Sequence, residues 1–447
     1  MRRDGLPPRP AIRTGRPDAA PVGPDALQGV ALGPDIMAGT LPSRHDRRRR
    51  PGSRTAPDAS GPARGAETAS PRKAARPVRG TLAAAGLWIH ELPHQPENRT
   101  AKRTAMFAQL SNPILLGLFA AASIVVFVAS FRMTRLADII ADRTGLGEAI
   151  AGGVFLGAAT SLSGLTVSAT AAWGGDASLA VSNGVGGIAA QTVFLAVADL
   201  TLRKANLEHA AAEPANLFQA ALLMALLTLP VMAFAMPAWS IWGVHPVSVV
   251  MAAGYLYGVR VSHQVREAPM WEPISTPETR TDEPEDEEEP GRDWRGPALA
   301  FAGLAALLAL SGWVISSTAS VATERFGMSS SLVGALATAL VTSMPELVTT
   351  VTAVRRGALQ LAVGGIIGGN TFDTMFLVIS DGFYREGPIF NAMNEQDLYW
   401  LATGLLMTAI LIAGLIRRQK QGPGGIGVET VLLIAVYLGA VGVQAFR

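Results

Sequence analysis

The sequence contains no cysteine, few charged residues and few histidines, and each shortage excludes a class of protein. Without cysteine, disulfide bonds and thiolate metal sites are impossible. The six histidines stand neither beside a candidate nucleophile nor at a metal-binding spacing within an apolar segment, so nothing favours an enzyme. Only 16% of the 447 residues are charged, whereas 49% are apolar. The apolar residues form long blocks without amphipathic spacing, which is typical of a polytopic helical membrane protein.

Ten of these apolar blocks are long enough to cross a bilayer as helices. They lie at 112–130, 148–172, 177–198, 216–236, 239–259, 297–319, 330–353, 358–380, 398–416 and 426–445. Fifteen basic residues follow the odd-numbered blocks, whereas three lie in the alternate connections or at the C-terminus. The positive-inside rule therefore predicts that both ends of the bundle face outward, in what we expect to be a bacterial plasma (inner) membrane.

The sequence also contains an internal duplication. When residues 160–199 are shifted by 182 positions they align without a gap on 342–381, and fifteen of the forty positions are identical. Matched apolar hairpins of this kind indicate a duplicated transporter. We therefore predict an all-α polytopic membrane protein whose ten transmembrane helices form two inverted five-helix repeats, at 106–260 and 296–447.

Two segments lie outside this scheme. Residues 1–105 hold 19 of the 37 Lys and Arg residues but no apolar periodicity, and we interpret them as a disordered basic tail. Because such a tail would have to cross to the outside, a true translation start near Met106 is an alternative. No aromatic residues are interleaved with the charges, so we expect no nucleic-acid partner. Residues 261–295 are acidic but lack the ligand pattern of an EF-hand, and we interpret them as a cytoplasmic linker.

Two acidic residues fall inside predicted spans of the second repeat. Glu346 aligns with Gly164 of the first repeat, and Asp373 aligns with Gln191. A carboxylate at bilayer depth costs roughly 2.5–3.5 kcal/mol even on the lenient insertion scale. No lysine or arginine lies near the centre of any predicted span, so a cation or protons are the natural partners of these two acids.

Polar neighbours accompany both acids along their helices. Thr342 and Ser343 precede Glu346 by four and three residues, so all three share one helix face, and Asn370 precedes Asp373 by three. Pro345 removes a backbone donor and is expected to kink the helix and free carbonyls near the site. Glycines in these spans let the helices approach closely enough for hydroxyls and carboxylates to converge, although helix packing without a binding site would also explain the glycines.

These motifs resemble those of the calcium/cation antiporter superfamily, whose best-known members are sodium/calcium exchangers. Residues 342–346 read Thr-Ser-Met-Pro-Glu, close to the Thr-Ser-Leu-Pro-Glu motif of that family, and 368–373 read Gly-Gly-Asn-Thr-Phe-Asp. The first repeat matches in part, through 160–162 and Asn183. The resemblance covers residues 106–447 and implies two inverted five-helix halves, with ions bound between the second, third, seventh and eighth spans.

The first repeat departs from the family pattern. Gly164 stands where the family has glutamate, Gln191 where it has asparagine, and Gly187 and Gly369 replace serines. The site that the resemblance implies keeps both carboxylates in the second half and takes neutral oxygens from both halves. Its candidate cation ligands are Glu346, Asp373, Thr342, Ser343, Asn370, Thr160, Ser161 and Gln191. Loss of the glutamate should weaken calcium binding, and Gly164→Glu is expected to raise divalent affinity.

The sequence therefore predicts a secondary active cation antiporter that moves calcium against sodium or protons by alternating access. Its partners would be inorganic cations and the lipid bilayer, and it would need no cofactor. Two alternatives stay open: a monovalent cation/proton exchanger using the same acids, or a degenerate, non-transporting membrane subunit. The ion pair, its stoichiometry and the oligomeric state do not follow from the sequence.

Overall fold

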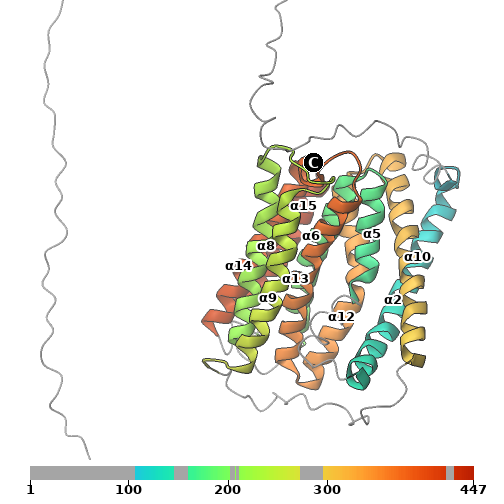
Figure 1. The fold of residues 1–447 in the computed structure, drawn as a ribbon. Coiled ribbons are helices and arrows are strands. Elements are labelled where there is room, and N and C mark those ends of the chain that lie inside the picture. Colours follow the sequence, from blue (N-terminus) through green and yellow to red (C-terminus); the bar gives the residue numbers. More distant parts are fainter. Residues whose placement is uncertain are drawn as a thin grey trace, which may run out of the picture. The chain divides into compact units, whose positions relative to one another are not determined.

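The computed structural model describes residues 106–144, 160–201, 207, 211–271, 295–418 and 427–446 (Figure 1). Within these residues the regular structure is helical, without a β-strand, and Ile241 and Val244 form one isolated bridge. The predicted basic tail at 1–105 lies outside the described residues, as does most of the predicted linker at 261–295.

The first half of the bundle contains five described helices. They are α2 (Asn112–Thr144), α5 (Leu162–Trp173), α6 (Ala177–Asp199), α8 (Pro214–Ala235) and α9 (Pro246–Glu267). The second half contains α10 (Arg295–Phe326), α11 (Ser330–Leu332), η3 (Val333–Thr338), α12 (Ala339–Arg356), α13 (Leu359–Phe383), η4 (Ile389–Ala392), α14 (Glu395–Arg417) and α15 (Val428–Ala445). Eight membrane-span candidates, long and apolar enough to cross a bilayer, occur in the described part: α2, α6, α8, α10, the α11–α12 segment, α13, α14 and α15. The chain is thus an integral membrane protein.

The centre of the bundle is built from helices of both halves. Helix α6 contacts α5 and also α12, α13, α14 and α15 from the second half. The apolar window of α6 is 89% buried, compared with 28% for α2. Figure 1 shows α2 and α10 side by side at one edge, with α8, α9 and α14 toward the other. The two halves therefore interleave around α6 and α13.

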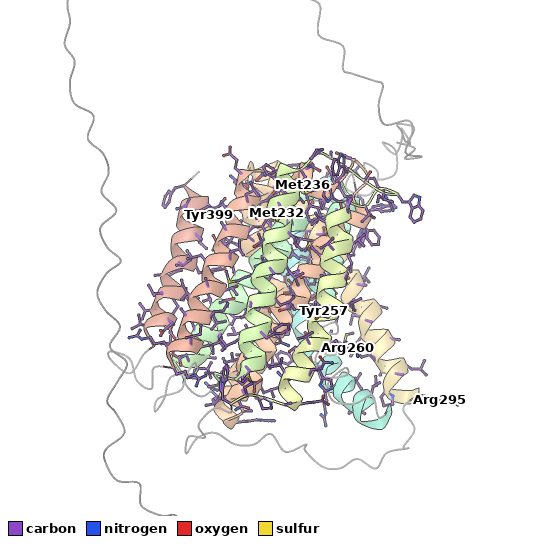
Figure 2. The ribbon with its side chains drawn as sticks, turned by 60° about the vertical axis from the view of Figure 1, so that its left-hand side comes forward. Met232, Met236, Tyr257, Arg260, Arg295 and Tyr399 are labelled. Carbon is purple, nitrogen blue, oxygen red and sulfur yellow. The ribbon has the colours of Figure 1, made fainter. Side chains whose placement is uncertain are left out.

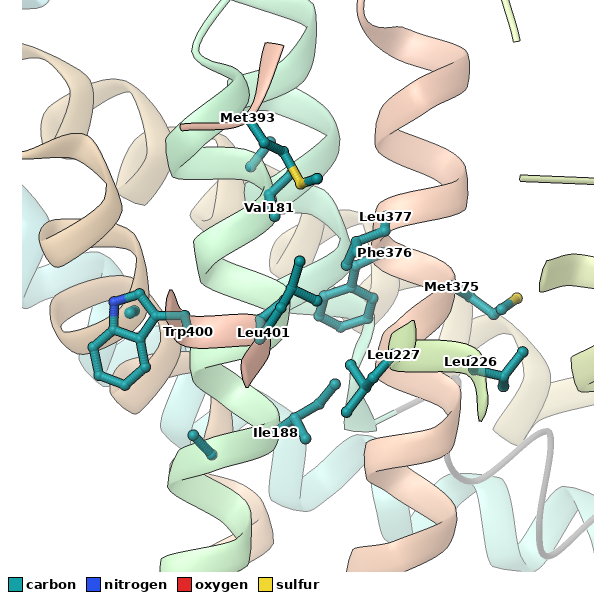
Figure 3. Packing of buried hydrophobic residues seen from close by; sticks show 14 of the residues in the cluster. Val181, Ile188, Leu226, Leu227, Met375, Phe376, Leu377, Met393, Trp400 and Leu401 are labelled. Carbon is teal, nitrogen blue, oxygen red and sulfur yellow. The ribbon is translucent and has the colours of Figure 1, made fainter. Parts of the chain in front are cut away.

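A continuous apolar core surrounds these central helices. The largest buried cluster joins residues of α6, α8, α13 and α14, including Leu227, Phe376 and the fully buried Trp400 (Figure 3). Because lipid tails are as apolar as these side chains, close packing holds such helices together in a membrane. This packing positions the polar side chains of α6 and α13 within the core.

Two helices differ from the sequence-based expectation. The fifth span was predicted at 239–259, but α9 begins at Pro246, a favoured first helical residue, after His245 accepts a hydrogen bond from the Val247 backbone N–H. The seventh span was predicted to kink at Pro345, and in the structure α12 runs without interruption through this proline from Ala339 to Arg356. The irregularity of this span instead lies upstream in the π-helical turn η3, a feature often found at functional sites.

Two buried aspartates make matching connections between the halves. Asp199 accepts hydrogen bonds from the Leu207 and Gly427 backbone N–H groups and, at 2.7 Å, from the Thr430 hydroxyl of α15. We call this arrangement the Asp199 clamp. Both of its cross-half donors, Gly427 and Thr430, belong to the second half of the chain.

The Asp381 clamp has the same construction. Asp381 accepts hydrogen bonds from the Ile389 and His245 backbone N–H groups and, at 2.7 Å, from the Ser248 hydroxyl of α9. Each residue of one clamp corresponds to a residue of the other clamp 182 positions further along the chain. The corresponding pairs are Asp199 and Asp381, Leu207 and Ile389, His245 and Gly427, and Ser248 and Thr430. Each half thus supplies donors to the buried aspartate of the other, which ties the two halves together reciprocally.

Figure 2 places charged residues at the ends of the bundle. Arg260 of α9 and Arg295 of α10 lie toward the same end, whereas Met236 lies toward the opposite end. Arg295 is the last residue of the predicted linker at 261–295 and Arg260 immediately precedes that linker, so the structure brings its two edges to one end of the bundle.

Candidate cation-binding site

The candidate site lies near the middle of the two central helices. Gln191 of α6 is eight residues, or about 12 Å, from the C-terminal end of its helix. Asp373 of α13 is ten residues, or about 15 Å, from the end of its helix. Both residues therefore lie near the middle of helices long enough to cross a hydrocarbon core of about 30 Å.

Asp373 is buried among hydrogen-bond donors from the first half. One carboxylate oxygen accepts from the Ser161 hydroxyl at 2.7 Å, and the other accepts from the Gln191 side-chain amide at 2.7 Å. The Asp373 side chain is 2% exposed. Two neutral donors stabilise a buried carboxylate only in part, so this group retains a strong attraction for a cation or a proton.

Glu346 on α12 faces the same cavity with fewer partners. Its side chain is 9% exposed, the Thr160 hydroxyl donates a hydrogen bond to it, and its Oε2 atom has no hydrogen-bond partner. The free oxygen is a strong acceptor in a low-dielectric interior, where an unpaired polar atom is costly. Glu346 is therefore the group with the most unsatisfied binding capacity in this cavity.

Gln191 connects the two repeats at this level. The amide that donates to Asp373 also donates to the Ser343 hydroxyl at 3.2 Å, while the Oε1 atom has no partner. The offset of 182 exchanges Ser161 with Ser343 and Asp373 with Gln191. The Ser161–Asp373 bond of one repeat therefore corresponds to the Gln191–Ser343 bond of the other. The Gln191–Asp373 bond joins two positions that are themselves equivalent in the duplication.

The remaining hydroxyl of the predicted set also lies at the cavity. The Thr342 hydroxyl donates to the Thr338 backbone carbonyl at 3.0 Å, which leaves its lone pairs available. One small cavity is lined by six of the predicted ligands: Ser161, Gln191, Thr342, Ser343, Glu346 and Asp373. Thr160 reaches it through its bond to Glu346.

Asn370 is the exception among the predicted ligands. Its side-chain amide donates to the Thr192 hydroxyl at 3.0 Å, and the residue does not line the cavity. The three-residue spacing from Asp373 was correct as a helix face, but α6 packs against α13 so that Asn370 contacts Thr192 instead. Nothing in the sequence spacing distinguishes these two directions.

Four lining residues were not in the predicted ligand set: Gly164, Asn183, Gly187 and Phe376. Asn183 donates to the Gly164 carbonyl at 3.0 Å and to the Ser168 hydroxyl at 2.9 Å, and it accepts from Thr338 at 2.7 Å. It joins α5, α6 and η3 at the floor of the site. Gly187 and Phe376 also line the cavity. The identity of Phe194 with Phe376 in the duplication was the available signal for Phe376.

The arrangement is suited to cations. Two carboxylates, several hydroxyls and one amide oxygen converge, and no described lysine or arginine pairs with either acid. Hard cations prefer such oxygen ligands. The described residues hold no group of three or more His, Asp or Glu side chains placed for a metal ion. The site is therefore shared between carboxylates and neutral oxygens, as expected of a site that must also release its ion.

Fold and site together define an integral membrane protein with a candidate cation site at the middle of a helical bundle. The chain belongs to the sodium/calcium exchanger protein family, whose model matches residues 114–261 and 296–446. This family consists of secondary transporters and not of enzymes, and its members carry cations as substrates without a cofactor.

Two characterised relatives match part of the chain. "Putative antiporter CaxA" of Alkalimonas amylolytica is 31% identical over 152 residues, covering 34% of this chain and 46% of the relative. "Inner membrane protein YrbG" of Escherichia coli K12 is 31% identical over 136 residues, covering 30% and 39%. The matched segment thus spans less than half the length of each relative.

Two solved structures share the fold. The crystal structure of the H⁺/Ca²⁺ exchanger CAX matches with a TM-score of 0.54 at 14% identity, covering 78% of this chain and 93% of that one. Native YfkE matches with a TM-score of 0.50 at 14% identity, covering 78% and 98%. At such identities these likenesses concern the fold alone.

Proposed function

We propose that the protein is a secondary active cation antiporter that moves calcium against sodium or protons by alternating access. The observation that carries this proposal is the mid-bundle cavity where Glu346 and Asp373 meet hydroxyl and amide oxygens, with no basic partner among the described residues. A calcium ion needs about 6–8 oxygen ligands. The two carboxylates, the hydroxyls of Thr160, Ser161, Thr342 and Ser343, and Gln191 Oε1 would supply them, with Asn370 outside the shell.

In this mechanism calcium and its counter-ion compete for the same carboxylates. Occupancy by either ion neutralises the buried charge and lowers the cost of rearranging the helices around the site. The names of the relatives agree with this assignment, since one is described as an antiporter and a structural neighbour as an H⁺/Ca²⁺ exchanger.

We also propose the finer membrane arrangement on these grounds. Ten spans would form two inverted five-helix repeats, at 106–260 and 296–447, with 261–295 as a cytoplasmic linker and both bundle ends outside. The matching clamps and the charge distribution support this topology. A bacterial inner membrane agrees with the Escherichia coli relative, which is described as an inner membrane protein.

The test is radioactive calcium uptake into proteoliposomes loaded with sodium, and separately with an acidic interior. We expect gradient-driven uptake by the wild type and a fall to below about a tenth for Glu346→Gln, because the principal charged ligand is lost. Glu324→Gln, on the exposed face of α10, is the matched control and should transport normally.

The outcomes separate the alternatives. The gradient that supports uptake identifies the counter-ion. If neither gradient drives calcium but rubidium or sodium flux responds to a pH gradient, the protein is a monovalent cation/proton exchanger. Absence of every flux would contradict the transporter proposal and favour a non-transporting membrane subunit.

A further inference from the structure

The charge at the site comes entirely from one half of the molecule. Among the described residues that line the cavity, Glu346 and Asp373 are the ionisable ones. Tyr255 of α9 is close enough to Asp373 to interact with it electrostatically, but a phenol is neutral at physiological pH. The other charged residues of α12 and α13, such as Arg355 and Asp381, stand toward the helix ends. When both acids are deprotonated, the empty site therefore carries two negative charges.

Phe376 occupies the space in which a third carboxylate would have to lie. A Cβ atom added at Gly164 would stand 2.7 Å from Cε2 and 3.1 Å from Cζ of Phe376, and 3.3 Å from the Thr342 hydroxyl oxygen. Carbon atoms pack at about 3.5–4.0 Å, so the first two distances are steric clashes. The expectation that Gly164→Glu alone would raise divalent affinity is therefore revised: a glutamate has no room while Phe376 holds this position.

The Phe376 ring is held firmly in place. The side chain is 3% exposed, and its ring meets that of Phe372 edge-on with 6.4 Å between centroids. On the α6 side, a Cβ at Gly184 would approach Phe376 Cβ to 3.3 Å, which shows how closely the helices pack. Figure 3 shows the ring within the buried cluster that includes Leu227 and Leu377. The ring cannot move aside without disturbing this packing.

The cavity itself is small. The space between the lining residues that a water-sized body can enter measures about 10 Å³, close to the minimum that holds one water molecule. One small ion fits this space, and two sodium ions would require the lining residues to move apart. Two protons would need no such space, because they bind to the carboxylate oxygens themselves.

We propose that the contact between Gly164 and Phe376 limits the site to two carboxylates, so that each cycle exchanges one divalent cation for two monovalent positive charges and is electroneutral. One divalent ion, two protons or two sodium ions each cancel the charge of Glu346 and Asp373. Carrying an unbalanced charge through the bilayer interior is costly, so the neutralised forms are the ones that cross. This inference rests on the proposed antiport function and specifies its stoichiometry.

The test clamps the membrane potential of calcium-transporting proteoliposomes with potassium and valinomycin at zero and at about −100 mV. We expect the same initial rate at both potentials. Movement of one net charge would instead change the calcium gradient at equilibrium by about 50-fold over 100 mV, and the initial rate by up to the same factor. As a second measurement on the wild type, a tenfold counter-ion gradient should sustain a hundredfold calcium gradient at equilibrium. Sodium and proton gradients are tested separately to distinguish the two counter-ions.

Variants then examine the role of Phe376. Gly164→Glu combined with Phe376→Ala adds a charge and the room for it, and its flux should become sensitive to potential. Phe376→Ala alone adds room without charge, so its flux should stay insensitive even if the rate changes. If the double variant does not fold, the two wild-type measurements still decide whether the exchange is electroneutral.

Three results would contradict the inference. These are a wild-type rate that depends strongly on potential, a calcium gradient that rises as the cube of the counter-ion gradient, and a double variant that folds and transports yet remains insensitive to potential. Absence of any gradient-driven calcium flux would instead refute the proposed function, and the inference would fall with it.

Discussion

The segments 160–199 and 342–381 occupy corresponding places around the site, which allows their contacts to be compared. Both supply a serine that bonds across the repeat boundary, Ser161 to Asp373 and Ser343 to Gln191. Both end in an aspartate that receives donors from the other half, Asp199 and Asp381. The framework of helices, clamps and serine contacts is thus the same in the two segments.

The charged positions differ completely between the same two segments. Glu346 has glycine as its counterpart at 164, and Asp373 has an amide as its counterpart at 191. The first segment therefore supplies neutral donors and acceptors, whereas the second supplies all of the charge. The comparison teaches that the framework of a duplicated transporter and its ion-binding charge are separable: contacts that hold the halves together persist where charges do not.

The strongest way to break this comparison is to move a charge from one segment to the other. Asp373→Asn removes a charge and places an amide against the Ser161 and Gln191 donors, so calcium uptake should fall to below about a tenth of the wild-type rate. Adding Gln191→Asp should restore part of the uptake, because the new carboxylate faces Ser343 as Asp373 faces Ser161. Uptake is measured in proteoliposomes, with elution on size exclusion as the folding control.

If the exchanged double variant folds but transports no better than Asp373→Asn alone, positions 191 and 373 are not equivalent in the site. The pseudo-symmetry would then extend to the framework and not to the ion-binding function.

The clamps offer a test on stability. Asp199→Ala and Asp381→Ala each leave three buried donors without their acceptor, and an unpaired buried donor costs about 1–3 kcal/mol. We expect both variants to lower the thermal midpoint in detergent, and by similar amounts. Gly382→Ala, next to the Asp381 clamp and with no heavy atom near its added Cβ, is the matched control. A loss confined to one aspartate would show that the reciprocal clamps are not energetically equivalent.

The smallest effect is expected at Asn370. Because its amide bonds to Thr192 outside the cavity, Asn370→Ala should change calcium affinity by less than about twofold while lowering stability by about 1 kcal/mol. Thr192→Ala removes the same bond from the other side and should behave alike. Isothermal titration with calcium, together with thermal midpoints, would check both. A tenfold loss of affinity in Asn370→Ala would return this residue to the ion shell.

Much of the fold follows from the sequence because bilayer thickness and charge placement constrain it strongly. Long apolar blocks predicted the membrane helices, and eight of the described helices have the required length and composition. Helix boundaries were less accurate where local capping decided them, as at Pro246. The duplication aligns Asp199 with Asp381 but does not reveal that they bond to Thr430 and Ser248.

The candidate site was predicted in composition but not in geometry. Seven of the eight predicted ligands line the cavity or bond directly to a lining residue, because intramembrane carboxylates and their hydroxyl neighbours are distinctive in a sequence. Asn370 was misplaced, since helix spacing gives a face but not the helix that packs against it. The role of Phe376 in filling the space beside Gly164 was missed, because an apolar residue in an apolar helix does not by itself indicate that it borders a site.

The sequence by itself determined that this is a helical membrane protein, that it is internally duplicated, and that both site carboxylates lie in its second half. These properties depend on residue type and spacing along one chain. Only the tertiary structure decided that both oxygens of Asp373 are bound by the first half, that the halves hold each other by reciprocal clamps, and that Phe376 fills the space beside Gly164. Those properties depend on which helices pack together and at what distance, and contacts between residues 133 to 231 positions apart are not encoded in any local pattern.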